Sequence, residues 1–265
     1  IALGDEKLSL EEFNKLIEES NDGLIQYNGK YILVDKTEGK KLYEQIANAN
    51  HKKMTRLELI HASMSGQLQN YDFNYDDAYA NVIKDFAKPV EVENPADLKG
   101  ELRPYQMTGL KWLWTNISKG FGCCMADDMG LGKTLEIISL ILSDTEEKPS
   151  LIVCPKSLIY NWKKEFNNWA KSIDVQVISG SIEERKEIIK SGDNNKKTVF
   201  ITSYDSLRND LELYDTAKFR FCILDEAQFI KNHLTLKAQS VKQIKSEIRF
   251  VLTGTPIENS LSDLW

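Results

Sequence analysis

The chain has 265 residues, enough for one large domain or two of ordinary size. It is 42% hydrophobic and 28% charged, as globular proteins are, and no apolar run approaches the ~20 residues that a membrane helix needs. Residues 1–98 carry 11 basic and 18 acidic side chains (net charge -7), whereas residues 99–265 carry 23 and 22 (net charge +1). The acidic total therefore does not exclude a nucleic-acid partner for the second part, because a groove needs only local positive charge.

A capped helix and a hairpin are predicted near the start of the chain. Ser9 and Glu12 have the spacing of a capping box, at the start of the amphipathic stretch SLEEFNKLIEE. The run LIQYNGKYILV then places two β-rich segments around Asn28-Gly29, the dipeptide that favours a type I′ turn. Together these elements predict a small α+β region.

The stretch that follows leads into a predicted connector. Thr55 and Glu58 form a second capping box, which starts the predicted helix MTRLELIHA. Residues 63–99 are polar and weakly patterned, with two prolines near their end, which is typical of a linker. We therefore expect an α+β region over residues 1–62, a connector over 63–99 and a separate domain over 100–265.

The last part of the chain alternates between short apolar runs and helical stretches. One helical stretch, SIEERKEIIKSG, carries a capping box formed by Ser181 and Glu184. The apolar runs are unbroken, as in strands that are buried on both faces of a parallel sheet. They are FGCCMA, LIVCP, VQVIS, TVFITS, FCILDE and RFVLTGT. The predicted fold class is α/β, with a doubly wound, mostly parallel sheet.

The four cysteines, Cys123, Cys124, Cys154 and Cys222, form no C-x-x-C pair. Most of them lie inside the apolar runs. This pattern favours free, buried thiols in a reducing compartment over disulfides or a metal site.

The segment ADDMGLGKT, residues 126–134, lies between the first apolar run and the apolar helix TLEIISLIL. This strand–loop–helix context is that of a phosphate-binding loop, although the strict pattern has glycine where this chain has Asp127. Gly130 and Gly132 allow a close approach of the backbone to phosphate oxygens. Lys133 is suited to reach the β- and γ-phosphates, and the Thr134 hydroxyl to ligate Mg²⁺.

The run FCILDEAQ ends in two adjacent carboxylates, Asp225 and Glu226. A hard cation such as Mg²⁺ prefers oxygen ligands, and Asp225 is the candidate to hold it. Glu226 is the candidate to orient or deprotonate an attacking water. A lone Asp-Glu pair is often only solvated, but the phosphate-loop pattern upstream favours the catalytic interpretation.

Together these segments resemble the Swi/Snf-related DNA-translocating ATPases of helicase superfamily two. The family motifs occur in order as ELRPYQMTGLKWL, ADDMGLGKT, LIVCPKSLIYNWKKEF, VFITSYDSL, LDEAQFIKN and VLTGTPIENSLSDLW. The resemblance covers about residues 100–265 and implies a RecA-like first lobe. The family loop typically reads D-E-M-G-L-G-K-T, which explains Asp127, while Asp128 replaces the usual Glu.

The resemblance implies that ATP and Mg²⁺ are the cofactors. Gln106 is expected to read the adenine edge, with Arg103 nearby, and Lys133 and Glu226 are the expected catalytic residues. Thr134 and Asp225 would hold Mg²⁺ through the nucleotide. The remaining expected nucleotide contacts are Asp128, Met129, Gly130, Leu131, Gly132, Lys133 and Thr134.

Double-stranded DNA is the implied partner of this lobe. Pro155, Lys156 and Ser157, together with Ser203 and Tyr204, match segments that contact the DNA backbone in the family. For each of these residues, a helix-capping or packing role is the competing interpretation.

A further set of residues is expected to couple the nucleotide site to a second lobe. Thr253, Gly254 and Thr255 match the motif that carries this coupling in the family. Gln228 departs from the His or Gly common at its position. We expect this change to leave the chemistry intact and to alter coupling.

The early segment LSLEEFNKLIEESNDGLIQYNGKYILVD resembles the helicase-associated N-terminal region of bacterial members. This resemblance implies a protein of the bacterial cytoplasm that acts at DNA, with residues 1–98 as a possible contact for a protein partner. Beginning without Met and ending directly after a motif-rich stretch, the chain is expected to be a piece of a longer protein.

Three functions remain open from the sequence. The leading one is an ATP-driven double-stranded DNA translocase or remodeller of protein–DNA complexes. The alternatives are a strand-separating RNA or DNA helicase and a nucleotide-gated scaffold without turnover. The second lobe of the family supplies arginines from a motif of roughly Q-x-x-x-R-x-x-R, which does not occur in this sequence. The chain alone is therefore expected to be inactive.

Overall fold

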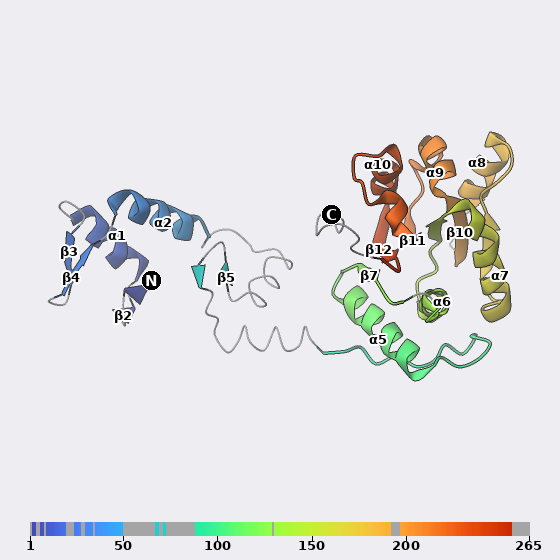
Figure 1. Cartoon of the computed structure of the whole chain (residues 1–265), viewed down its shortest axis with the longest axis horizontal. Helices are drawn as coiled ribbons and strands as arrows, with labels where there is room; N and C mark the ends of the chain where they lie inside the picture. The colour runs from blue at the N-terminus through green and yellow to red at the C-terminus, as the bar shows by residue number, and fades with distance from the viewer. Residues whose placement is uncertain are drawn as a thin grey trace. The chain divides into compact units, whose positions relative to one another are not determined.

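The computed structural model describes residues 2–3, 6–7, 9–19, 24–27, 30–33, 35–49, 67–68, 71–72, 88–128, 130–191 and 197–255. The chain divides into two compact units, Ile1–Asp85 and Phe86–Trp265 (Figure 1). The boundary between the units falls inside the connector predicted over residues 63–99. Within the described parts of the chain, no helix is long and apolar enough to cross a membrane.

The first unit contains the predicted helix and the predicted hairpin. Helix α1 (Leu10–Glu19) begins at the expected capping box, in which the Ser9 backbone N–H donates to Glu12 Oε2 at 2.8 Å and the Glu12 N–H to Ser9 Oγ at 3.2 Å. Strands β3 (Leu24–Tyr27) and β4 (Lys30–Leu33) pair antiparallel. The turn between them lies outside the described residues, as does the predicted helix that starts at Thr55.

Further short elements complete the description of the first unit. Helix α2 (Lys36–Ala49) begins where Asp35 Oδ1 accepts hydrogen bonds from the next turn of backbone, including the Thr37 N–H at 2.7 Å. Its mixed, charged sequence gives little apolar periodicity, and the sequence analysis did not predict it. Two pairs of two-residue strands are also present: β1 (Ala2–Leu3) with β2 (Glu6–Lys7), and β5 (Gln67–Leu68) with β6 (Tyr71–Asp72).

The second unit is built on a six-stranded sheet in the order β7-β12-β11-β8-β10-β9, in which every neighbouring pair is parallel. All six apolar runs form strands, as predicted. The strands are β7 (Cys123–Met125), β8 (Ser150–Cys154), β9 (Asp174–Val177), β10 (Thr198–Ser203), β11 (Phe219–Asp225) and β12 (Ser246–Leu252). The α/β fold class is therefore confirmed.

Helices flank this sheet, as Figure 1 shows. The α-helices are α5 (Pro104–Ser118), α6 (Lys133–Ser143), α7 (Ile159–Trp169), α8 (Ile182–Ser191), α9 (Tyr204–Asn209) and α10 (Leu236–Gln243). Three 3-10 turns, η1 (Lys156–Leu158), η2 (Leu211–Tyr214) and η3 (Ala227–Ile230), join them to the strands. The predicted capping box of α8 is present, with the Ser181 N–H donating to Glu184 Oε2 at 2.7 Å.

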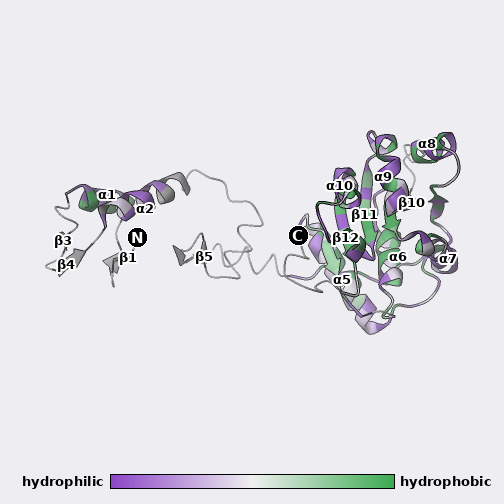
Figure 2. Ribbon diagram, turned by 45° about the horizontal axis from the view of Figure 1, so that its top comes forward, coloured by the Kyte–Doolittle hydropathy of each residue, from purple (hydrophilic) through white to green (hydrophobic). Residues whose placement is uncertain are grey.

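Two hydrophobic cores lie on opposite faces of the sheet. Successive strand residues point to opposite faces, so Ile152 and Ile223 join a core with α5, α6 and α7, whereas Val153 and Leu224 join one with α8, α9 and α10. The apolar colouring of the central strands in Figure 2 reflects this burial on both sides. The unbroken apolar runs of the sequence follow from it.

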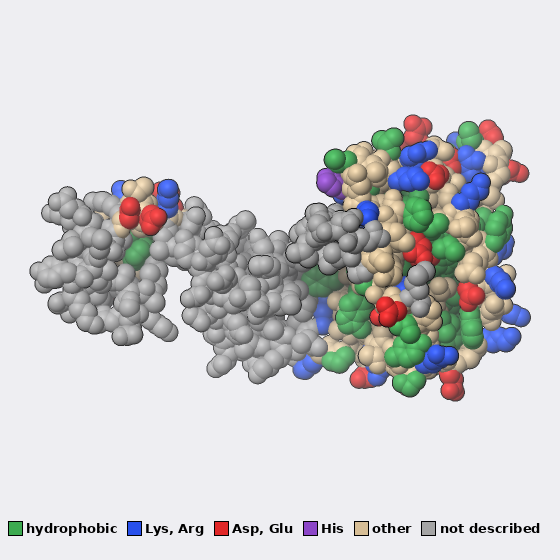
Figure 3. Space-filling model, in the orientation of Figure 1, with side chains coloured by type: hydrophobic (Ala, Val, Ile, Leu, Met, Phe, Trp, Pro, Cys, Tyr) green, Lys and Arg blue, Asp and Glu red, His purple; other side chains and the backbone are tan. Residues whose placement is uncertain are grey.

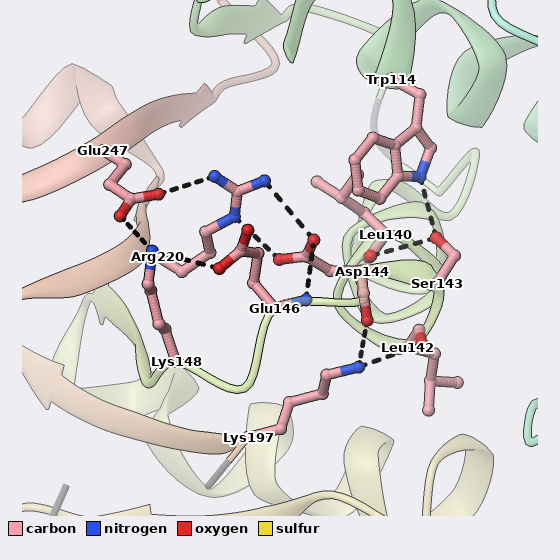
Figure 4. A network of polar contacts seen from close by, with 10 residues as sticks. All are labelled: Trp114, Leu140, Leu142, Ser143, Asp144, Glu146, Lys148, Lys197, Arg220 and Glu247. Atoms are coloured by element: carbon pink, nitrogen blue, oxygen red, sulfur yellow. Dashed lines mark hydrogen bonds and ion pairs between the residues drawn. The ribbon is translucent and has the colours of Figure 1, made fainter. Parts of the chain in front are cut away.

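An ion-pair network joins the amino ends of the central strands (Figure 4). Arg220 on β11 donates from Nε to Asp144 Oδ2 at 2.9 Å and from Nη1 to Glu247 Oε2 on β12 at 2.7 Å. Lys148 bridges Glu247 and Glu146. The network ties the loop between α6 and β8 to the sheet edge opposite the carboxyl ends of the strands.

Candidate nucleotide site

The predicted phosphate loop runs from the end of β7 to the start of α6. Gly130 and Gly132 have φ angles of +89° and +90°, a left-handed conformation that glycine adopts without strain. Lys133 Nζ folds over the loop and donates to the carbonyl oxygens of Asp127 at 2.5 Å and Asp128 at 3.2 Å. Both of these acceptors are backbone oxygens of the loop, which the ammonium can exchange for phosphate oxygens. Met129 lies outside the described residues.

The first turn of α5 is hydrogen-bonded to the phosphate loop. Gln106 Oε1 accepts a hydrogen bond from the Arg103 N–H at 3.0 Å, and Gln106 Nε2 donates to the Leu131 carbonyl at 3.2 Å. The Tyr105 hydroxyl donates to the same carbonyl at 2.9 Å. A Cβ added at Gly132 would lie only 2.4 Å from Gln106 Nε2. Gln106 is therefore packed on the loop, Arg103 is exposed beside it, and Tyr105 is a contact that the sequence analysis missed.

The carboxylate of Asp225 lies at the carboxyl end of β11 and accepts two hydrogen bonds. Trp162 Nε1 donates to Asp225 Oδ2 at 2.7 Å, and the Glu226 backbone N–H donates to Oδ1 at 2.9 Å. Burial raises the pKa of Asp225, which the Trp162 hydrogen bond and the charge of Lys133 partly counteract. A carboxylate that is oriented and close to the phosphate-loop lysine suits a divalent cation bound with phosphates.

A chain of hydrogen bonds runs from Glu226 to the end of β12. Gln228 Nε2 donates to Glu226 Oε2 at 2.7 Å, and Thr253 Oγ1 donates to Gln228 Oε1 at 3.2 Å. The Thr255 N–H in turn donates to Thr253 Oγ1 at 3.1 Å, with Gly254 between them. Glu226 has φ 51°, and among the described residues it alone combines a side chain with a positive φ. The predicted coupling residues thus contact the predicted catalytic carboxylate through Gln228.

Sheet order brings the two halves of the site together. Asp225 is in register with Leu252 of β12, and Leu252 is in register with Met125 of β7. The Thr253 N–H extends the pairing by donating to the Met125 carbonyl at 3.1 Å. Because the three carboxyl ends are level, Lys133 and the half-buried Thr134 face the same edge of the sheet as Asp225.

The residues predicted to contact DNA divide into two groups. Lys156 and Ser157 are exposed in η1, and Pro155 just before them is half-buried. Ser203 is buried as the N-cap of α9, where its Oγ accepts the Ser206 N–H at 3.1 Å. Tyr204 is also buried, and its hydroxyl donates to the Asp225 carbonyl at 2.8 Å. In the structure, the Ser203 side chain caps α9 and the Tyr204 side chain packs in the core, so a DNA contact through these two residues stays a prediction.

A buried acid next to the phosphate loop was not singled out from the sequence. Glu136 lies in the first turn of α6, is 3% exposed, and its Oε2 has no hydrogen-bond partner among the described residues. Burial and the nearby charge of Asp127 raise the pKa of Glu136 to about 7, against the opposing effect of Lys133. Glu136 lines an open pocket of about 660 Å³ between α5 and the end of β7. The sequence did offer a signal for this residue, because Glu136 is the one charged residue in the apolar stretch TLEIISLIL.

The cysteines behave as free thiols in the structure. Cys123, Cys154 and Cys222 are buried, and burial raises the pKa of each to about 12. Cys124 is exposed on the outermost strand, β7, in contrast to the expectation of burial. Successive side chains of a strand alternate between the two faces of the sheet, so Cys124 points away from the core that buries Cys123 and Met125.

Comparison with known proteins places this site in a family context. A family profile described as SNF2-related domain matches residues 105–265, and one described as SNF2 Helicase protein matches residues 1–64. The solved structure titled "Sulfolobus solfataricus SWI2/SNF2 ATPase core in complex with dsDNA" is 38% identical, with a TM-score of 0.59, and the match covers 66% of this chain and 36% of that one.

One curated relative extends the likeness over nearly the whole chain. The "Putative ATP-dependent helicase/translocase YwqA" of Bacillus subtilis is 30% identical over 98% of this chain and 30% of its own length. The "Uncharacterized ATP-dependent helicase MG018" of Mycoplasma genitalium is 39% identical over 62% of this chain and 16% of its own length. The chain thus spans less than a third of these relatives. On the match over residues 105–265, it belongs to the SNF2-related family of ATPases.

Proposed function

We propose that this chain is the ATP-binding lobe of a DNA-dependent ATPase that translocates on double-stranded DNA or remodels protein–DNA complexes. The observation that carries the proposal is the level alignment of β7, β12 and β11, which puts the loop of Lys133 beside Asp225 and Glu226. A phosphate cradle with a metal-binding and a water-orienting carboxylate is the arrangement that phosphoryl transfer requires.

Each residue has a distinct role in this proposal. The loop at Gly130 and Gly132 receives the phosphates, and Lys133 leaves the loop carbonyls to contact their oxygens. Thr134 and Asp225 hold Mg²⁺, which supplies charge neutralisation at the phosphates when it is bound with the nucleotide. Glu226 accepts a proton from, or orients, the attacking water.

Gln228 supports Glu226 in this scheme. The amide of Gln228 remains neutral and keeps donating to Glu226 Oε2, so the carboxylate stays turned toward one position. Thr253 is hydrogen-bonded to Gln228, so a movement of the segment after β12 would shift Gln228 and with it Glu226. We assign to these residues the coupling between the nucleotide site and the second lobe.

Turnover requires a second lobe of the full-length protein. The chain spans 30% or less of the two curated relatives named above, and its 265 residues contain no Q-x-x-x-R-x-x-R motif. The absence of a transition-state arginine costs roughly 10³- to 10⁵-fold in rate. We therefore expect the chain alone to bind nucleotide weakly and to hydrolyse it negligibly, with or without DNA.

Double-stranded DNA is the proposed partner, contacted through Lys156 and Ser157. These exposed groups suit phosphate oxygens and give no base preference. On the face drawn in Figure 3, basic and acidic side chains of the second unit are interspersed, which favours weak binding. We place the protein in the bacterial cytoplasm, at the nucleoid, in keeping with the Bacillus relative. We also propose residues 1–98 as the contact for a protein partner.

Calorimetry on the chain tests the nucleotide site. We expect ADP or ATP with Mg²⁺ to bind with an affinity of tens of micromolar to millimolar, or about 4–6 kcal/mol. Lys133→Ala should weaken binding, whereas Lys186→Ala, which changes an exposed lysine on α8, should not. Equal affinity in wild type and Lys133→Ala would remove the phosphate-loop assignment.

The full-length protein separates the candidate functions. DNA-stimulated phosphate release that is lost in Glu226→Gln supports the ATPase and excludes a scaffold without turnover. Displacement of a triplex strand from intact duplex indicates translocation, whereas separation of the duplex strands indicates a helicase. The proposal expects the first of these two outcomes.

A further inference from the structure

Trp162 is a buried tryptophan of α7 whose indole reaches the nucleotide site. Its side chain is 1% exposed and packs against Phe166, with ring centroids 6.2 Å apart. Its one polar atom, Nε1, donates to Asp225 Oδ2 at 2.7 Å. A buried indole N–H needs an acceptor, and here that acceptor is the carboxylate proposed to hold Mg²⁺.

The carboxylate of Asp225 is held by more than its backbone. The torsion that turns a carboxylate about its Cβ–Cγ bond has a broad energy profile, so the backbone position alone does not orient the two oxygens. The Glu226 N–H at 2.9 Å fixes Oδ1, and the Trp162 indole fixes Oδ2. Each oxygen keeps a second lone pair for a cation or its water ligands.

We propose that Trp162 is a positioning residue, which orients the Asp225 carboxylate for Mg²⁺ bound with the nucleotide. The inference rests on the proposed function of the site. Groups that hydrogen-bond to metal ligands typically alter metal affinity about 10- to 100-fold when they are removed. Loss of the indole N–H leaves Asp225 in place but lets its carboxylate turn, so the metal-dependent part of nucleotide binding should suffer.

The same helix offers a matched control. Trp169 ends α7, and its Nε1 donates to Glu165 Oε2 at 2.9 Å, within the helix itself. Trp162→Phe and Trp169→Phe therefore make the same chemical change on one helix. Only the first removes a hydrogen bond to Asp225.

The experiment measures the affinity of the chain for ADP by calorimetry, once with Mg²⁺ and once with EDTA. In wild type, we expect Mg²⁺ to increase the affinity. In Trp162→Phe, we expect the increase to shrink about tenfold while the affinity in EDTA is unchanged. Trp169→Phe should match wild type in both conditions.

A second variant guards against misfolding of Trp162→Phe. Replacement of Trp162 by β-(3-benzothienyl)alanine keeps the shape of the indole and substitutes sulfur for the N–H, so it tests the hydrogen bond with little change in packing. A folded variant of either kind with the wild-type response to Mg²⁺ would overturn the positioning role alone. If the ADP affinity is the same with Mg²⁺ and with EDTA, and the same in wild type and Lys133→Ala, the proposed function is wrong and the positioning role is wrong with it.

Discussion

Replacement of Arg220 by Ala is expected to cost the second unit a large share of its stability. The guanidinium of Arg220 pairs with Asp144, and the two side chains are only 16% and 5% exposed. Without Arg220, Asp144 would stay buried at the end of α6 with its negative charge unpaired. The loss of one partner from a buried ion pair typically costs about 3–5 kcal/mol.

The exposed ion pair of the same network should contribute much less to stability than the buried one. Lys148 and Glu247 lie 2.7 Å apart, but their side chains are 45% and 43% exposed. Exposed pairs contribute roughly 0–1 kcal/mol because water screens them. We therefore expect Arg220→Ala to lower the free energy of unfolding by about 3–5 kcal/mol and Lys148→Ala by less than about 1 kcal/mol.

Urea unfolding followed by circular dichroism measures both values. The double variant Arg220→Met with Asp144→Leu should recover most of the loss, because a buried ion pair can be replaced by apolar groups of similar size at little cost. ADP affinity should not change, since the network lies at the edge of the sheet opposite the phosphate loop. A loss in Arg220→Ala no larger than that in Lys148→Ala would refute the reasoning.

Three further predictions concern the site. Gly132→Ala should weaken ADP binding in calorimetry, because the φ angle of residue 132 is +90° and the new Cβ would lie 2.4 Å from Gln106 Nε2. If the variant bound ADP as tightly as the wild type, this geometry of the loop would be contradicted. Gln228→Ala in the full-length protein should lower DNA-stimulated kcat about tenfold, because Glu226 loses a hydrogen bond to its charged carboxylate, while nucleotide affinity is retained. An unchanged kcat would show that the hydrogen bond from Gln228 to Glu226 does not support catalysis. Lys156→Glu should lower affinity for every duplex alike in fluorescence anisotropy, and log K against log salt should have a shallow slope of roughly -1 to -2 in the wild type. Tight binding to a single sequence, or indifference to salt, would show that the DNA face lies elsewhere.

Features that depend on neighbouring residues could be read from the sequence alone. The six strands follow from unbroken apolar runs, and the capping boxes at Ser9 and Ser181 from side chains three residues from their partners. The phosphate loop is likewise a continuous segment, so its glycines and Lys133 could be assigned before any tertiary contact was known. Helix α2 was not predicted because its apolar pattern is weak, although Asp35 caps its first turn through a local contact.

Features that depend on which strands are neighbours were decided only by the tertiary structure. The sheet order puts β12 between β7 and β11, and this alone joins Gln228 to Thr253 and sets Lys133 near Asp225. Trp162 meets Asp225 across 63 positions of sequence, a pairing that no local pattern encodes. The burial of Ser203 and Tyr204 has the same origin. Neighbouring parallel strands are joined by long crossover connections. The order of the strands in the sheet is therefore set by how the helices and strands pack into the two cores, and not by the residues next to each strand in the sequence.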